Sequence, residues 1–163
     1  MSFGKRAAAM LLVPVAVLTS QTATAADCDA LAAIFAAHGS KFESMAGEMT
    51  SGSMMTYVYE AKAGPGSAGF TLSDCVVRSN SRTMIYRCER DFDEVETLQS
   101  AYDSGVSDLG RCLVARSSSR TSAVQQETGF VPAQGHEGTL TLGTRRGNGG
   151  DLTLYLSIYA LKD

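Results

Sequence analysis

Residues 84–113, MIYRCERDFDEVETLQSAYDSGVSDLGRCL, decide the fold, because they predict a strand that leads directly into the longest helix of the chain. Around Tyr86 the side chains alternate with the two-residue period of a pleated strand. From Phe92 onward, apolar residues recur every three or four positions, which places one apolar stripe on a helix. Asp91 and Glu94 have the spacing of a capping pair for its start. The stripe consists of Phe92, Val95, Leu98, Tyr102, Val106, Leu109 and Leu113.

The N-terminus has the pattern of an export signal. Lys5 and Arg6 precede an apolar run at residues 7–18, and Ala23 and Ala25 are the small residues that a signal peptidase recognises. The run is too short to span a bilayer, and no later segment approaches the required length of about 20 residues. We therefore predict a signal peptide at residues 1–25 and one mature domain at residues 26–163. The protein is expected to be periplasmic or secreted, without membrane insertion after cleavage.

Charge restricts the possible partners. The formal net charge is −3, and the predicted leader holds two of the 14 basic residues and none of the 17 acidic ones, which leaves −5 on the mature chain. An acidic chain argues against nucleic acid or an anionic membrane surface as the partner.

Four cysteines in an exported chain are typical of two disulfides. A helix from residue 92 to residue 112 would be about 30 Å long, whereas the Cα atoms of a disulfide lie within about 7 Å. Cys88 therefore should not pair with Cys112, unless a glycine breaks the helix. Of the two remaining pairings we favour Cys75–Cys88 with Cys28–Cys112. The spacings match no zinc or redox motif, and we expect no metal site and no cofactor.

The segments before this unit predict two helices and two strands. Leu31, Ile34, Phe35 and His38 share one helical face, and a capping box at residues 40–43 predicts a second short helix through Met45. Strands are expected at residues 54–62 and 70–77, joined by a flexible loop at residues 63–69. After Leu113, the polar, serine-rich residues 117–129 predict a surface loop that includes at most an edge strand.

The C-terminal residues predict a hairpin. Leucines alternate at positions 140 and 142 and again at 152, 154 and 156, across a glycine-rich turn. Leucines must face leucines across the pair, because a slip of one residue moves a whole set to the other face. This register requires a loop of three or five residues. The opposite face then carries Thr139, Thr141, Arg145, Tyr155 and Tyr159.

These elements predict a two-layer α+β domain, with one antiparallel sheet of five to six strands and an N-terminal helical segment and a long central helix packed on it. The apolar stripe of the long helix should lie on the leucines of the hairpin. The sequence shows no internal repeat.

Three functional classes fit the sequence. We favour a non-catalytic protein-binding module, such as an inhibitor, an immunity-type protein or a chaperone-like envelope protein. Tyrosine and arginine concentrate binding energy at protein interfaces, so the expected binding residues are Tyr155, Tyr159, Thr141 and Arg145, and the expected partner is another protein. The alternatives are a structural component of the cell envelope and a small hydrolase. The hydrolase would use His136 with Glu137 and a serine at residues 117–119, but the chain contains no GxSxG elbow.

Overall fold

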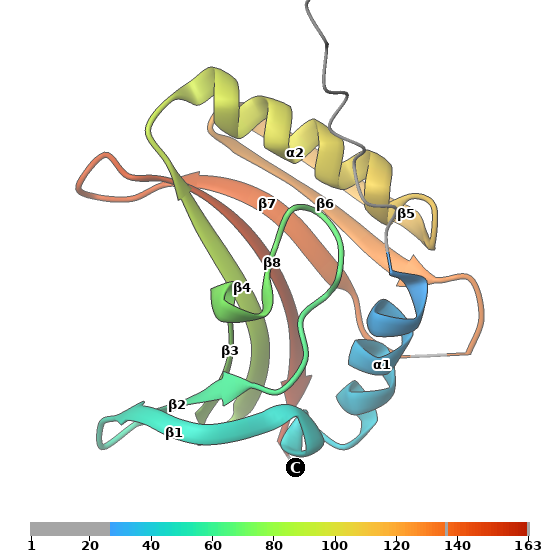
Figure 1. Ribbon diagram of the computed structural model, residues 1–163, viewed down its shortest axis with the longest axis vertical. Coiled ribbons are helices and arrows are strands. Elements are labelled where there is room, and N and C mark those ends of the chain that lie inside the picture. Colours follow the sequence, from blue (N-terminus) through green and yellow to red (C-terminus); the bar gives the residue numbers. More distant parts are fainter. Residues whose placement is uncertain (1–26, 136, 163) are drawn as a thin grey trace, which may run out of the picture.

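Two helices and eight strands make up the protein, as described by a computed structural model for residues 27–135 and 137–162 (Figure 1). The helices are α1 (Cys28–Gly39) and α2 (Val95–Leu109), and short 3-10 turns lie at Glu43–Met45 and Leu72–Asp74. The strands are β1 (Ala46–Gly52), β2 (Thr56–Ala61), β3 (Cys75–Asn80), β4 (Thr83–Phe92), β5 (Leu113–Ser122), β6 (Gln125–Pro132), β7 (Leu140–Arg146) and β8 (Leu152–Leu161). The predicted signal peptide and its cleavage site before residue 27 lie outside the described residues.

All eight strands form one antiparallel sheet in the order β1-β2-β3-β4-β8-β7-β6-β5. The α+β class is confirmed, but the prediction of five to six strands is wrong. The element order also contains a repetition that the sequence does not show. A helix followed by a four-stranded meander occurs twice, and the two meanders join where β4 pairs with β8.

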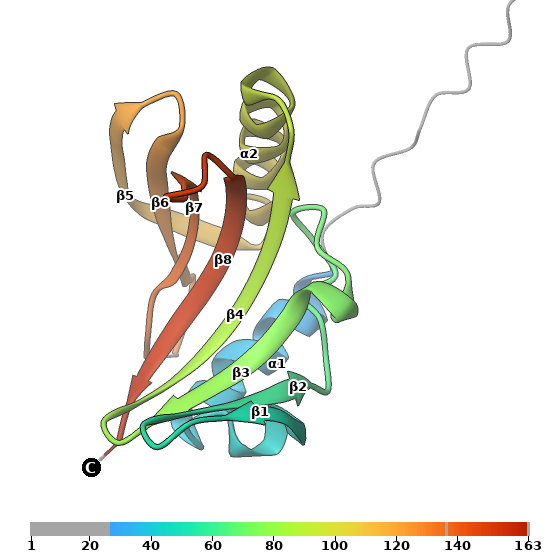
Figure 2. The same cartoon turned by 90° about the vertical axis from the view of Figure 1, so that its left-hand side faces the viewer.

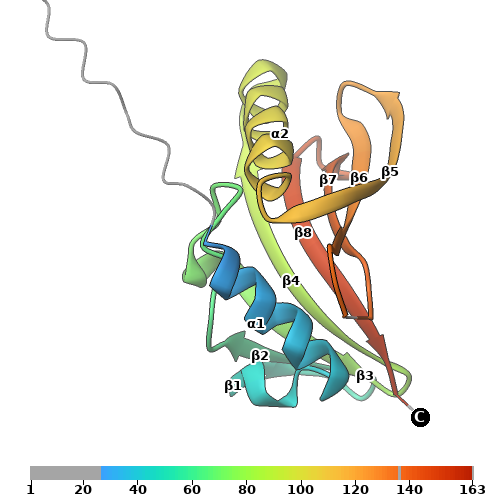
Figure 3. The ribbon, with the colours of Figure 1, turned by 90° about the vertical axis from the view of Figure 1, so that its right-hand side faces the viewer.

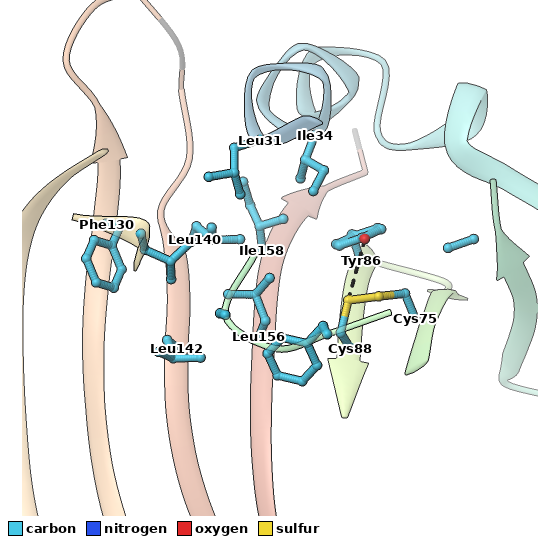
Figure 4. Close-up of a cluster of buried hydrophobic side chains, with 14 of the residues drawn as sticks. Leu31, Ile34, Cys75, Tyr86, Cys88, Phe130, Leu140, Leu142, Leu156 and Ile158 are labelled. Atoms are coloured by element: carbon cyan, nitrogen blue, oxygen red, sulfur yellow. Dashed lines mark hydrogen bonds between the residues drawn. A yellow bond between two sulfur atoms is a disulfide. The ribbon is translucent and has the colours of Figure 1, made fainter. Parts of the chain in front are cut away.

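Both helices lie on the same face of the sheet, here called the helix face. Figure 3 shows α1 and α2 in front of the sheet, and Figure 2, from the opposite side, shows β3, β4 and β8 in front of α1. Leu31 and Ile34 of α1 point toward Ile158 of β8 (Figure 4). Gly105 of α2 lies so close to β7 that an added Cβ would be 2.9 Å from Leu142 Cδ2. The other face, here called the open face, carries no described helix.

The C-terminal hairpin has the predicted register. Leu142 is opposite Leu156, and the strands are joined by the five residues 147–151. Leu140, Leu142, Leu154, Leu156 and Ile158 are all buried on the helix face. Because β4 pairs with β8 from Thr83↔Leu161 to Phe92↔Leu152, the two longest central strands hold the sheet together.

Three local predictions are wrong. Residues 117–129 form most of the hairpin β5–β6 rather than a loop, and only the edge strand allowed there, β5, is present as predicted. Residues 46–52, for which no element was predicted, form the other edge strand, β1. The second short helix ends at Met45 as predicted but is only the 3-10 turn Glu43–Met45. Its predicted capping box does not form, because Lys41 and Phe42 have positive φ angles and no side chain caps the turn. The long helix begins at Val95 rather than at Phe92, since β4 continues through Phe92 along β8.

Two disulfides join distant parts of the chain, with the pairing favoured above. Cys28, at the start of α1, is bonded to Cys112 beyond the end of α2, with Cα atoms 5.4 Å apart. Cys75 and Cys88 are directly opposite on β3 and β4, with Cα atoms 4.0 Å apart. Tyr86 lies beside this second bridge (Figure 4), fully buried, and its hydroxyl donates to the carbonyl of Ala63 at 3.0 Å. The two intramolecular disulfides point to an oxidising environment.

Candidate binding face

Tyr155 lies in a row of four residues that crosses the open face. Glu127 of β6 is opposite Gly143 of β7, Gly143 is opposite Tyr155 of β8, and Tyr155 is opposite Glu89 of β4. Cross-strand partners lie about 5 Å apart with their side chains on the same face. The register alone therefore brings one aromatic ring and two carboxylates together.

Gly143 makes room for the ring. A Cβ built at Gly143 would lie 2.5 Å from the Cζ and Oη atoms of Tyr155, a separation that real Cβ atoms do not show. The ring thus covers the glycine and reaches across β7, where the Tyr155 hydroxyl donates to Glu127 Oε1. Burial, and then the hydrogen bond and negative charge of Glu127, raise the pKa of the Tyr155 phenol above its usual value. Tyr155 is therefore a neutral donor throughout the physiological pH range.

Three arginines surround the carboxylate of Glu89. Glu89 accepts from Arg145 at 2.6 Å, Arg87 at 2.7 Å and Arg78 at 3.4 Å. The Arg87 guanidinium also lies over the ring of Tyr155, 5.2 Å from its centroid, a cation–π geometry. The arginines come from β3, β4 and β7, so their positions depend on the folded sheet. Arg78, Arg87, Arg145, Glu89 and Tyr155 are here called the arginine cluster.

The cluster has more positive charge and more donors than its own carboxylates use. The three arginines exceed Glu89 and Glu127 by one charge, whereas the whole chain is acidic. The buried Nε atoms of Arg78 and Arg87 have no hydrogen-bond partner in the described part of the chain. The side chains of Arg78 and Arg145 remain 43% and 50% exposed. A planar guanidinium has five donors, so the cluster offers N–H groups to an anionic group from outside.

The structure places the four predicted binding residues on the open face, but it does not bring all of them together. Tyr155 and Arg145 belong to the arginine cluster. Thr141 is partly buried and lies opposite Ser157, two residues before Gly143 on the same face of β7. Tyr159 lies further along β8 opposite Ile85 and is 50% exposed.

Five members of this site were not predicted from the sequence: Arg78, Arg87, Glu89, Glu127 and Gly143. The alternation of Tyr86 and Cys88 with Arg87 already placed Arg87 on the face opposite the buried tyrosine. The same alternation extends to Glu89, so these two could have been found. Glu127 could not, because its segment was predicted to be a loop.

His38 has a structural contact. Its Nε2 atom lies 3.0 Å from the carbonyl oxygen of Tyr159, so this ring nitrogen carries the proton and donates. The ring also packs edge-on against Phe42 at 5.9 Å. His38 thereby ties the end of α1 to the end of β8.

The residues of the alternative hydrolase are only partly described. His136 lies outside the described residues, and residues 117–119 lie in the exposed edge strand β5. Within residues 27–135 and 137–162, no group of three or more histidine, cysteine, aspartate or glutamate side chains is placed to hold a metal ion. Neither helix in this part of the chain has the length and apolar character needed to cross a bilayer.

Comparison of the chain with protein-family models, with curated proteins and with solved structures gave no match.

Proposed function

We propose that the protein is an exported, non-catalytic protein-binding module that recognises its partner through the open face. The observation that carries this proposal is the arginine cluster, in which three guanidiniums share Glu89 beside a tyrosine on an uncovered sheet face. Arginine and tyrosine are enriched among the residues that dominate binding energy at protein interfaces. The five adjacent strands from β6 to β3 span about 20 Å, which is wide enough for an extended segment or a flat surface of a partner.

The chemistry of the cluster favours an acidic segment of the partner. Arg78 and Arg145 lie on either side of Glu89, and both retain exposed N–H groups. A partner carboxylate can accept two parallel hydrogen bonds from one guanidinium, and such bonds are among the strongest in proteins. Tyr159 and Thr141 supply the surrounding aromatic and hydroxyl surface. The protein would act in the periplasm or outside the cell, where its disulfides persist.

The test is capture of a partner from the native compartment with tagged wild-type protein, followed by affinity measurement for the captured protein. The double variant Tyr155→Ala/Tyr159→Ala and the single variant Arg145→Ala should each weaken binding. We expect a loss of about 2 kcal/mol or more for the double variant, which corresponds to roughly thirtyfold in Kd. Higher salt should also weaken binding, because the contact is partly ionic.

Met54→Ala/Met55→Ala is the matched control, because these side chains are apolar and strongly exposed but lie on the first hairpin. Unchanged affinity in the tyrosine variant together with loss of binding in this control would move the site to the β1–β2 hairpin. Assembly of the protein into a multimeric lattice would instead favour the structural class. Substrate turnover that is lost in His136→Ala would favour the hydrolase.

A further inference from the structure

A cleft with charged groups on both walls separates α2 from the β5–β6 hairpin on the helix face. Two adjoining hollows of about 490 and 280 Å³ share the side chains of Asp103 and Arg120. Asp103 comes from α2 and Arg120 from β5, so these two opposite charges lie on opposite walls. Glu96, also on α2, adds a second carboxylate to the larger hollow, so the α2 wall is acidic. Figure 3 shows the hairpin standing to one side of α2. The combined volume is in the range of small-molecule sites.

The floor of the cleft consists of hydrogen-bonding groups where a covered sheet usually carries aliphatic side chains. Thr128 of β6 is buried, and its hydroxyl is bonded to that of Tyr102 at 2.7 Å. Gln126, also buried, donates to the side-chain carbonyl of Gln99 at 2.9 Å. Because these groups are already paired with each other, the floor is polar but neutral. The charged groups of a ligand would therefore be recognised by the charged side chains of the walls and not by the floor.

Asp103 and Arg120 do not form an ion pair with each other. The side chain of Arg120 makes no hydrogen bond or ion pair with another residue in the described part of the chain. One oxygen of Asp103 accepts from Gln99 at 3.0 Å, which orients the carboxylate and leaves its other oxygen available. A cleft with a free guanidinium on one wall and an oriented carboxylate on the other is complementary to a ligand that carries both signs of charge.

We propose that this cleft binds a small zwitterion with an α-carboxylate and an α-ammonium group, as found in a free amino acid or a short peptide. The carboxylate lies against the Arg120 guanidinium, and the ammonium group lies against Asp103. The polar floor accommodates the backbone amide of a peptide. This site is separate from the arginine cluster, which lies on the other face of the sheet.

The probes are L-alanine, the dipeptide Ala-Ala, and Ala-Ala blocked either by N-acetylation or by C-terminal amidation. Titration calorimetry and amide chemical shifts of α2 and β5 report binding. We expect saturable binding of at least one unblocked probe and about tenfold weaker binding of both blocked peptides. Binding of L-alanine identifies a free amino acid as the ligand, and binding of Ala-Ala alone identifies a peptide.

Arg120→Gln should lower the affinity for unblocked Ala-Ala about tenfold and remove the penalty for C-terminal amidation. Asp103→Asn should do the same for N-acetylation. Arg116→Gln, on the same strand but not lining the cleft, and Asp93→Asn, before α2, are the matched controls and should leave binding unchanged. No saturation by any unblocked probe at about 10 mM, equal binding of blocked and unblocked forms, or equal effects in the controls would overturn the proposal.

Discussion

Gly143→Ala tests whether the Tyr155 ring is fixed over β7. The added Cβ would lie 2.5 Å from the Cζ and Oη atoms of Tyr155 and 2.9 Å from Glu127 Cγ. The ring cannot stay in place, and displacing it breaks the hydrogen bond from the Tyr155 hydroxyl to Glu127. It also separates the ring from the Arg87 guanidinium.

The magnitude follows from three contributions. Overpacking costs about 1–3 kcal/mol, and a hydrogen bond to a charged group contributes about 1.5–3 kcal/mol. Replacing glycine by alanine at an unstrained position gains about 0.4–1 kcal/mol through the unfolded chain. Because the face is partly exposed and water replaces part of the lost hydrogen bond, we expect a net destabilisation of about 2 kcal/mol. For a domain of this size, that lowers Tm by roughly 7 °C.

Urea denaturation of four proteins provides the measurement: wild type, Gly143→Ala, Tyr155→Ala and the double variant. In the Tyr155→Ala background, Gly143→Ala should cost far less, because the ring is gone and only the Glu127 side chain has to move aside. Gly39→Ala is the control, since a Cβ there meets nothing within 4 Å. Wild-type stability of Gly143→Ala, or the same loss with and without the tyrosine, would refute the placement of the ring.

Two further predictions concern the core. Breaking the Cys28–Cys112 bridge, which closes a separation of 84 residues, should lower the free energy of unfolding by about 4–5 kcal/mol. Breaking the Cys75–Cys88 bridge, with its separation of 13, should lower it by about 3 kcal/mol. Chemical denaturation of Cys112→Ser and Cys88→Ser checks this, and an equal loss in the two variants would contradict the loop-length argument. Burial raises the pKa of Tyr86 above the usual value of 10, so the stabilisation that comes from its neutral form is complete below about pH 10 and is lost as the pH rises further. Tm measured against pH should fall above about pH 10 and fall less steeply in Tyr86→Phe, and equal slopes would contradict the assignment.

The sequence predicted the elements that bury one face, because burial leaves a periodic pattern. The register of Leu142 with Leu156 and the apolar stripe through Leu98 and Leu109 follow from this rule. Phe92 fits both a strand and a helical stripe, and the ladder with Leu152 decides in favour of the strand.

Strands without a buried face could not be predicted in this way. β5 is exposed at nearly every position, because α2 does not cover it, so its serines and arginines show no alternation. Its pairing with β6 depends on backbone hydrogen bonds, which every sequence can make. For the same reason only part of the binding site could be predicted from the sequence. Tyr155 and Arg145 were predicted, but the row to Glu127 requires β6 to be a strand.

The joining of the two meanders at β4 and β8 sets the order in which the protein can fold. The pairs from Phe92↔Leu152 to Thr83↔Leu161 connect residues far apart in the chain, and β8 is the last described strand to be synthesised. Before β8 is synthesised, one edge of β4 is unpaired, and the apolar sides of α1 and α2 lack most of the sheet surface on which they pack. Non-local pairing of this kind slows folding. A growing chain therefore lacks the central β4–β8 pairing, and the packing of both helices on it, until β8 has been synthesised.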